Sequence, residues 1–256
     1  MPEKLVTPER VYRSRRRFLK ELGLAGGGAL LAGRSSLAQE AKAQGKSYPF
    51  ARNPEFDPKN TRLSDEEYVT GYNNFYEFTT SKTRVKRLTG KFVISPWEVE
   101  VGGLVEKPMK VSVDELVATM PMEERVYRLR CVEAWSAVVP WTGFPLRKLI
   151  EKVEPKADAK FVKFVTFLRR DEAPGFNEMP EYPWPYTEGL RLDEAMNPLT
   201  LVTTGMYGKP LPKQNGAPIR IVVPWKYGYK SIKSIVKIEF TREQPKTLWE
   251  TLAPDE

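Results

Sequence analysis

Residues 128–146 read RLRCVEAWSAVVPWTGFPL and contain Cys131, the only cysteine of the 256-residue chain. A lone cysteine cannot form a disulfide within its own chain. The neighbouring guanidinium groups of Arg128 and Arg130 favour the thiolate form of Cys131, which attacks electrophiles and binds soft metals. Free cysteine is also among the most buried residue types, so the local sequence leaves a purely structural role open.

The residues around Cys131 predict a strand that ends at a pocket. Residues 126–132 read as a β-strand with Cys131 near its C-terminal end, and residues 146–150 as the start of a short helix. Trp135 and Trp141 lie in between. Two tryptophans within ten residues of a lone cysteine suit the lining of a pocket, although core packing explains tryptophans equally well.

The composition excludes several kinds of active site. Hydrophobic residues make up 41% of the chain and aromatic residues 11%, enough for one large domain or two small ones. The chain contains no histidine. A serine-histidine triad is therefore excluded, and so are zinc sites of cysteine and histidine and iron–sulfur ligation within the chain.

The first 43 residues predict an export signal. Residues 14–20, SRRRFLK, match the twin-arginine pattern, and a glycine-rich, weakly apolar stretch follows at residues 22–33. Small residues predict cleavage after Ala38 or Ala43. We therefore expect a removed signal peptide at residues 1–43, a single domain at residues 44–256, and a periplasmic protein. Folded export favours a protein that acquires its cofactor in the cytoplasm.

The charge of the mature chain argues against a nucleic-acid partner. Removal of residues 1–43 takes away nine Lys/Arg and four Asp/Glu residues, which lowers the formal net charge from +8 to +3. Most of the basic character therefore belongs to the predicted signal, and we expect no nucleic-acid binding.

Two further stretches suggest binding loops. Asn73 and Asn74 lie between aromatic residues and suit a loop that hydrogen-bonds a planar heterocycle, although asparagine-rich turns are common. Residues 224–233, PWKYGYKSIK, alternate Lys226, Lys230 and Lys233 with aromatic residues and a glycine. Ammonium groups and backbone amides both favour an anion such as phosphate, although a solvated basic loop has the same charge pattern.

The remaining chain reads as short alternating elements. We expect an extended arm at residues 46–59 and two helix starts capped by Ser64 and Ser112, the second helix running to Thr119. Predicted strands are 92–94, 97–101 with a Gly102-Gly103 turn, 160–168, 219–223 and 234–240; residues 192–196 are predicted helical and 171–184 a long loop.

Several separated runs together resemble one family. They are NNFYEF (73–78), WEVEVGGLVEKP (97–108), RCVEAWS (130–136), WTGFPL (141–146), LPKQNGAP (211–218) and VPWKYG (223–228). They are similar to the molybdopterin domain of the sulfite oxidase superfamily and, within it, to the periplasmic catalytic subunits of protein-methionine-sulfoxide reductases. The resemblance covers nearly all of residues 44–256 and implies an α+β fold, a mixed, barrel-like β-sheet core with short helices.

The resemblance also implies site residues. Cys131 becomes the protein thiolate ligand of molybdenum, in one molybdenum–molybdopterin cofactor per chain. The implied cofactor-binding residues are Asn73, Tyr76, Glu77, Thr166, Asn215, Arg220, Ser231, Ile232 and Lys233. Catalytic residues stay unassigned, with Glu133 as a candidate to handle a proton or the substrate.

The implied reaction is reduction of methionine sulfoxide residues in oxidised periplasmic proteins, with electrons from a haem-containing membrane subunit. Thiol-based sulfoxide reduction needs a second thiol to resolve a sulfenic acid, and this chain has none. Two alternatives stay open: a sulfite or small-molecule sulfoxide oxidoreductase on the same fold, and a non-enzymatic exported module that binds anions.

Overall fold

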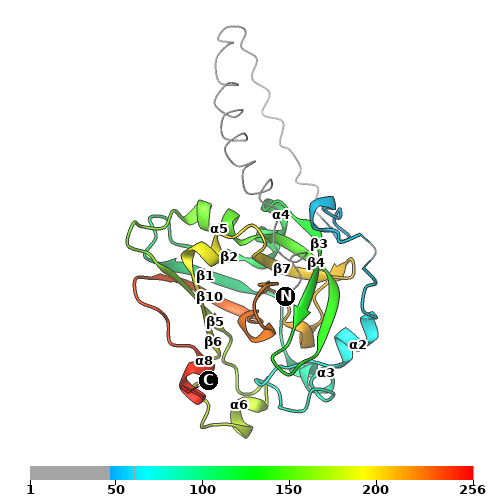
Figure 1. Ribbon diagram of the computed structural model, residues 1–256. Helices are drawn as coiled ribbons and strands as arrows, with labels where there is room; N and C mark the ends of the chain where they lie inside the picture. The colour runs from blue at the N-terminus through cyan, green and yellow to red at the C-terminus, as the bar shows by residue number, and fades with distance from the viewer. Residues whose placement is uncertain (1–46, 60, 256) are drawn as a thin grey trace, which may run out of the picture. The chain divides into compact units, whose positions relative to one another are not determined.

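The structure, a computed structural model, describes residues 47–59 and 61–255, so the predicted signal peptide lies outside the described residues (Figure 1). The strands are β1 (Glu98–Gly103), β2 (Met109–Ser112), β3 (Glu123–Arg130), β4 (Ser136–Pro145), β5 (Phe161–Thr166), β6 (Thr187–Arg191), β7 (Leu201–Met206), β8 (Lys209–Pro210), β9 (Arg220–Val222) and β10 (Ile235–Thr241). The α-helices are α2 (Glu66–Gly71), α3 (Val85–Leu88), α4 (Val113–Thr119), α5 (Leu146–Val153), α6 (Gly175–Glu178), α7 (Leu192–Ala195) and α8 (Leu248–Leu252), and the short 3-10 helices are η2 (Pro54–Phe56), η3 (Thr89–Lys91), η4 (Lys213–Asn215) and η5 (Gly228–Lys230). None of the described helices has the length and apolarity needed to span a bilayer.

The strands form two five-stranded sheets, which confirms the predicted α+β class with a mixed sheet. The first sheet has the order β2-β1-β10-β5-β6, with β1 and β10 parallel and the other pairs antiparallel. The second has the order β3-β4-β7-β8, and β9 also pairs with β7. Figure 1 shows the β3–β4 hairpin reaching toward the loops around α2 and α3, so this hairpin carries its far end to the region of the predicted binding loops.

Several predicted elements are confirmed. β5 alternates buried and half-buried residues, as expected of a strand with one face on the core. The hydroxyl of Ser112 accepts from the backbone N–H of Glu115 at 3.0 Å and caps α4. The arm lies on the domain as predicted, because Arg52 forms a β-bridge with Glu124 and the Tyr48 hydroxyl donates to Thr204 Oγ1.

Other details were predicted wrongly. Helix α2 begins one residue later than expected, after Asp65, because the Ser64 hydroxyl instead accepts from the N–H of Val138 in β4. Residues 92–94 are not a strand. Gly102 and Gly103 belong to β1 and pair with β10, where Gly103 has a φ of 81°. Local pattern could not reveal these outcomes, since each depends on a partner far along the chain.

Two further segments differ in part from the sequence prediction. The long loop at residues 171–184 contains the short helix α6. In β10 the predicted alternation is broken by a register shift between Ile235 and Lys237, so Ile235 is buried together with Ile238 and Phe240 while Val236 is only half-buried. Such a bulge changes the direction in which the following side chains point, and the residue pattern does not reveal it.

Gly143 should tolerate no side chain, because a Cβ atom there would collide with the backbone carbonyl of Val202 on β7. We expect Gly143→Ala to lower the free energy of unfolding by about 1–3 kcal/mol, the usual cost of overpacking. Urea denaturation of both proteins measures the change. Gly90→Ala is the control, since a Cβ there meets nothing within 4 Å. Equal effects of the two substitutions would contradict the close packing of β4 on β7.

Candidate active site

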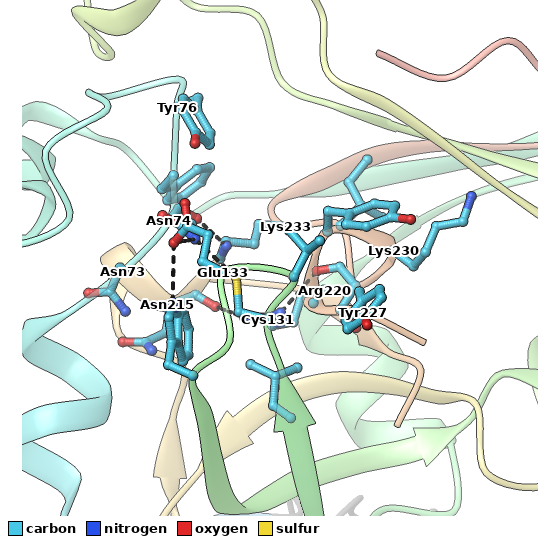
Figure 2. A pocket seen from close by; sticks show the side chains of 18 of the residues that line it. Asn73, Asn74, Tyr76, Cys131, Glu133, Asn215, Arg220, Tyr227, Lys230 and Lys233 are labelled. Atoms are coloured by element: carbon cyan, nitrogen blue, oxygen red, sulfur yellow. Dashed lines mark hydrogen bonds between the residues drawn. The ribbon is translucent and has the colours of Figure 1, made fainter. Parts of the chain in front are cut away.

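A cavity of about 950 Å³ opens where four separate segments of the chain meet. These segments are the loop after α2, the turn after β3, the stretch from η4 to β9, and residues 227–233; Tyr186 and the C-terminal segment around Trp249 complete the lining. Figure 2 shows their side chains turned toward one another, with Cys131 near the centre. The volume is typical of a cofactor or ligand pocket, and its lining comes from residues far apart in sequence.

Cys131 lies directly after β3, at the start of a tight turn. Its N–H donates to the carbonyl oxygen of Trp135 at 2.9 Å, and its carbonyl oxygen accepts from the N–H of Ala134. Ala134 has a φ of 69°, in the left-handed region that closes the turn. The Cys131 side chain is 7% exposed and lines the cavity. Both interpretations from the sequence, burial and a pocket position, therefore hold.

The charged groups that act on Cys131 differ from those that the sequence suggested. Arg128 and Arg130 are exposed and do not line the cavity, because alternation along β3 turns Leu129 inward between them. The half-buried ammonium of Lys233 instead interacts electrostatically with Cys131. The side-chain amide of Asn74 donates to Cys131 Sγ at 3.5 Å. The cation that interacts with Cys131 is therefore Lys233, and not its sequence neighbours Arg128 and Arg130.

Glu133 lies beside Cys131 and is held by three donors. Lys82 Nζ lies 3.1 Å from Oε1, and Asn74 Nδ2 and Trp135 Nε1 donate to Oε2 at 3.3 and 3.2 Å. Burial acts to raise the pKa of Glu133, but these hydrogen bonds outweigh it and leave the pKa below its ordinary value. Glu133 is therefore an ionised carboxylate at neutral pH at the wall of the cavity.

Two buried amides present unpaired carbonyl oxygens. The Nδ2 atoms of Asn73 and Asn215 both donate to the backbone oxygen of Val69 at 3.0 Å, which places the two side chains next to each other (Figure 2). Within the described part of the chain, Oδ1 of each has no hydrogen-bond partner. A buried acceptor without a donor is costly. The pair is therefore suited to a ligand that offers N–H groups.

Arg220 and Lys233 bring two cations to the same cavity, the first buried and the second half-buried. Arg220 donates to the backbone oxygens of Asn215 and Ser231 at 2.8 and 2.9 Å, and Lys233 Nζ donates to the backbone oxygen of Asn74 at 2.5 Å. Among the described residues neither forms a salt bridge with a carboxylate. Burial lowers the pKa of Arg220 to about 9. Burial followed by repulsion from Arg220 lowers the pKa of Lys233 to about 7, although the neighbouring Glu77 carboxyl acts to raise it.

An anion would relieve this arrangement. Buried charges without partners are strongly unfavourable, and an anionic group placed between the two cations would compensate both. Within the described part of the chain, no hydrogen bond engages the backbone N–H groups of Ile232 and Lys233, which follow Ser231 in the same loop. Two free amides and two cations form a site that a phosphate group would fit.

Three other predicted residues have different environments. Glu77 is almost fully buried, and burial raises its pKa to about 7. The Tyr76 ring packs edge-on against Trp249 at 5.6 Å. Thr166 does not line the cavity; its hydroxyl lies 2.8 Å from the backbone oxygen of Lys233, to which it donates, and so it holds the 231–234 turn from behind.

The structure therefore brings eight of the nine predicted cofactor residues, together with Cys131 and Glu133, to one cavity, and places Thr166 behind it. Sequence reasoning missed three residues of this region. Asn74 was noted beside Asn73 as a group that could bind a heterocycle, whereas the structure places its amide on Cys131 and Glu133. Lys82 and Trp249 had none, because only the fold brings Lys82 to Glu133 and Trp249 to Tyr76.

Comparison with known proteins agrees with this site. The family model described as oxidoreductase molybdopterin binding domain matches residues 87–249. The protein-methionine-sulfoxide reductase catalytic subunit MsrP of Campylobacter jejuni is 51% identical over 98% of this chain and 81% of its own length, and that of Burkholderia mallei is 50% identical over 100% and 78%. The sulfane dehydrogenase SoxCD of Paracoccus pantotrophus shares the fold, with a TM-score of 0.53 at 15% identity, covering 86% of this chain and 62% of that one.

The fold and the site together define an oxidoreductase domain that binds molybdopterin. The identity to curated relatives over nearly the full chain then settles the group within that class. The chain belongs to the family of the protein-methionine-sulfoxide reductase catalytic subunits MsrP. The resemblance drawn from the sequence is thereby confirmed.

The residues present fit the cofactor of this family. The unpaired oxygens of Asn73 and Asn215 suit the N–H groups on a pterin edge, and the cations of Arg220 and Lys233 suit its phosphate. Cys131 would supply the single soft ligand. Within the described residues no cluster of three or more His, Cys, Asp or Glu side chains could hold a metal ion, so the other ligands would come from the cofactor.

Proposed function

We propose that this chain is a molybdenum-dependent reductase of methionine sulfoxide residues in proteins, with one molybdenum–molybdopterin cofactor per chain. The observation that carries the proposal is the presence, in one cavity, of a lone thiol and two cations, Arg220 and Lys233, that form no salt bridge among the described residues. A thiolate suits molybdenum, and the cations suit a phosphate. The names of relatives that match the chain nearly end to end support the substrate.

The reaction consumes two electrons and two protons, and converts the sulfoxide to a thioether and water. The bound molybdenum cofactor supplies the two-electron oxygen-atom transfer. The chain's own residues bind and orient: Cys131 Sγ holds the metal, while Arg220 and Lys233 hold the phosphate. The Glu133 carboxylate faces the cavity beside Cys131, where its Oε2 atom can accept a proton and pass it on.

The electrons would come from a second protein. The relatives are named as catalytic subunits, which supports a partner subunit. We propose that it is a haem-containing membrane protein, that residues 1–43 are a twin-arginine signal, and that the mature domain works in the periplasm on oxidised envelope proteins. The SRRRFLK motif at residues 14–20 supports the location.

Of the alternatives, membership of an oxidoreductase family leaves the anion-binding module without support. A sulfite or small-molecule sulfoxide oxidoreductase remains a distinct candidate, because the same fold occurs in a sulfane dehydrogenase. It would turn over sulfite rapidly and oxidised protein slowly, the reverse of the proposed activity.

The test is to purify the mature protein from a molybdenum-replete host that makes the cofactor. Elemental analysis should give about one molybdenum per chain, and an artificial electron donor should drive reduction of methionine sulfoxide in an oxidised protein. Sulfite oxidation is assayed on the same sample. Metal-free protein, or sulfite turnover above that of oxidised protein, would overturn the proposal.

A further inference from the structure

Exposed apolar side chains gather at the mouth of the cavity. Eight large hydrophobic residues are exposed in the described part of the chain, and five of them line this cavity: Tyr68, Tyr72, Val132, Tyr227 and Tyr229. Tyr68 is 75% exposed and Val132 61%. The half-buried Trp135 lines the same opening. We call these six side chains the apolar rim. Clustered exposed apolar groups mark interaction sites, whereas scattered ones are ordinary.

The rim surrounds the turn that carries Cys131. At the start of that turn, Arg130 forms a β-bridge with Tyr227, whose ring stacks with that of Tyr229 at 6.4 Å (Figure 2 labels Tyr227). At its end, the ring of Trp135 packs edge-on against Tyr72 at 5.7 Å. One aromatic pair therefore lies at each end of the turn, with the exposed Val132 between them.

The aromatic side chains of the apolar rim make few contacts that stabilise the fold. Within the described residues, the side chain of Tyr68 makes no hydrogen bond and no ring contact, and the hydroxyls of Tyr72, Tyr227 and Tyr229 have no hydrogen-bond partner. Packing of the core therefore does not explain why these side chains occupy exposed positions. Tyrosine offers a large contact area at a low cost in conformational entropy, which favours it in binding surfaces.

The charge at the mouth favours an apolar occupant. The Glu133 carboxylate is neutralised by Lys82 in a 3.1 Å ion pair, so it is not available to attract a basic ligand. An occupant must also reach past the rim to Cys131. A methionine side chain is long and unbranched, and its peptide backbone extends to both sides of the point where it enters.

We propose that the apolar rim binds the apolar side chains on either side of the methionine sulfoxide in an extended segment of the substrate. This inference rests on the proposed function. The rim selects which sulfoxides in a protein are reduced, by binding their neighbours, while the cavity binds the sulfoxide itself.

The experiment uses the holoenzyme, an artificial electron donor and three substrates: free methionine sulfoxide, and two ten-residue peptides with one central methionine sulfoxide flanked either by Leu and Phe or by Gly and Ser. We expect KM to be about tenfold lower for the apolar-flanked peptide than for the Gly/Ser peptide. Tyr68→Ser combined with Tyr227→Ser should remove about that tenfold advantage through KM, with kcat within about twofold. KM for free methionine sulfoxide should change less than about twofold.

The matched control is Val93→Ser combined with Leu168→Ser, which removes two exposed apolar side chains that do not line the cavity. It should leave all three KM values unchanged. Calorimetry with the apolar-flanked peptide in its reduced, methionine form gives a binding constant that does not depend on turnover, and the rim variant should weaken it to the same extent.

Other outcomes have defined meanings. Equal KM values for the two peptides in the wild type, or equal losses in the rim and control variants, would overturn the rim proposal. A rim variant with unchanged peptide kinetics but impaired reduction by membranes containing the electron donor would assign the rim to the partner and also overturn it. Failure of the wild type on all three substrates would instead overturn the proposed function.

Discussion

Replacing Cys131 by alanine is expected to abolish molybdenum binding and sulfoxide reduction while the fold persists. Cys131 is the proposed molybdenum ligand and carries the only sulfur atom among the side chains that line the cavity, and its side chain makes one hydrogen bond, from Asn74. We expect turnover to fall by more than about 100-fold, beyond the 10–100-fold losses typical of residues that only support a metal ligand. The free energy of unfolding should fall by about 1 kcal/mol, because a small buried side chain becomes slightly smaller. Elemental analysis, activity and thermal unfolding measure the three quantities.

Asn74→Ala provides the graded comparison for Cys131→Ala. Its amide contacts Cys131 Sγ and Glu133 without being a candidate ligand. We expect it to keep molybdenum and lose activity by about 10–100-fold. A Cys131→Ala protein that retained metal and full turnover would remove Cys131 from the centre of the mechanism.

Lys233→Met is expected to stabilise the cofactor-free protein and to impair loading of the cofactor. The half-buried ammonium of Lys233 forms no salt bridge among the described residues, and burial and repulsion from Arg220 outweigh the attraction of the Glu77 carboxyl. A charge whose environment disfavours the charged form costs stability until an anion binds, so an apolar side chain of similar length should raise the free energy of unfolding. Denaturant unfolding of protein from a host that lacks molybdopterin measures this gain, and molybdenum content from a competent host measures the loss. Lys233→Glu should lower the molybdenum content further by charge reversal.

The pH dependence of unfolding provides a second measure of Lys233. Burial lowers its pKa to about 7 in the folded protein, against an ordinary value of 10.5. Between these two pH values the unfolded state binds more protons, so the stability of the cofactor-free wild type should rise with pH. The slope is at most about 1.4 kcal/mol per pH unit. Lys233→Met should lack this contribution.

The control for Lys233→Met is Lys156→Met, which removes an exposed lysine that forms no ion pair among the described residues. It should affect neither stability nor cofactor content by a measurable amount. If Lys233→Met kept full molybdenum content, Lys233 would play no part in holding the phosphate.

The identities of the residues alone were enough to predict the class of chemistry. One cysteine without histidine removed most other metal sites and thiol-based repair, and multi-residue runs identified the family that the comparisons confirm. Strands such as β5 and the Ser112 cap of α4 were also predictable, because their signals lie within a few residues of each other.

The three-dimensional fold was needed wherever a partner lies far along the chain. Sequence neighbours suggested Arg128 and Arg130 as the cations beside Cys131, but strand alternation turns both to solvent, and Lys233, about a hundred positions away, acts in their place. The sequence predicted that Ser64 caps a helix, but in the structure its hydroxyl accepts a hydrogen bond from the N–H of Val138 in β4. The unpaired amide oxygens and the apolar rim are likewise invisible in the sequence, because burial and exposure are properties of the packed chain and not of any local pattern.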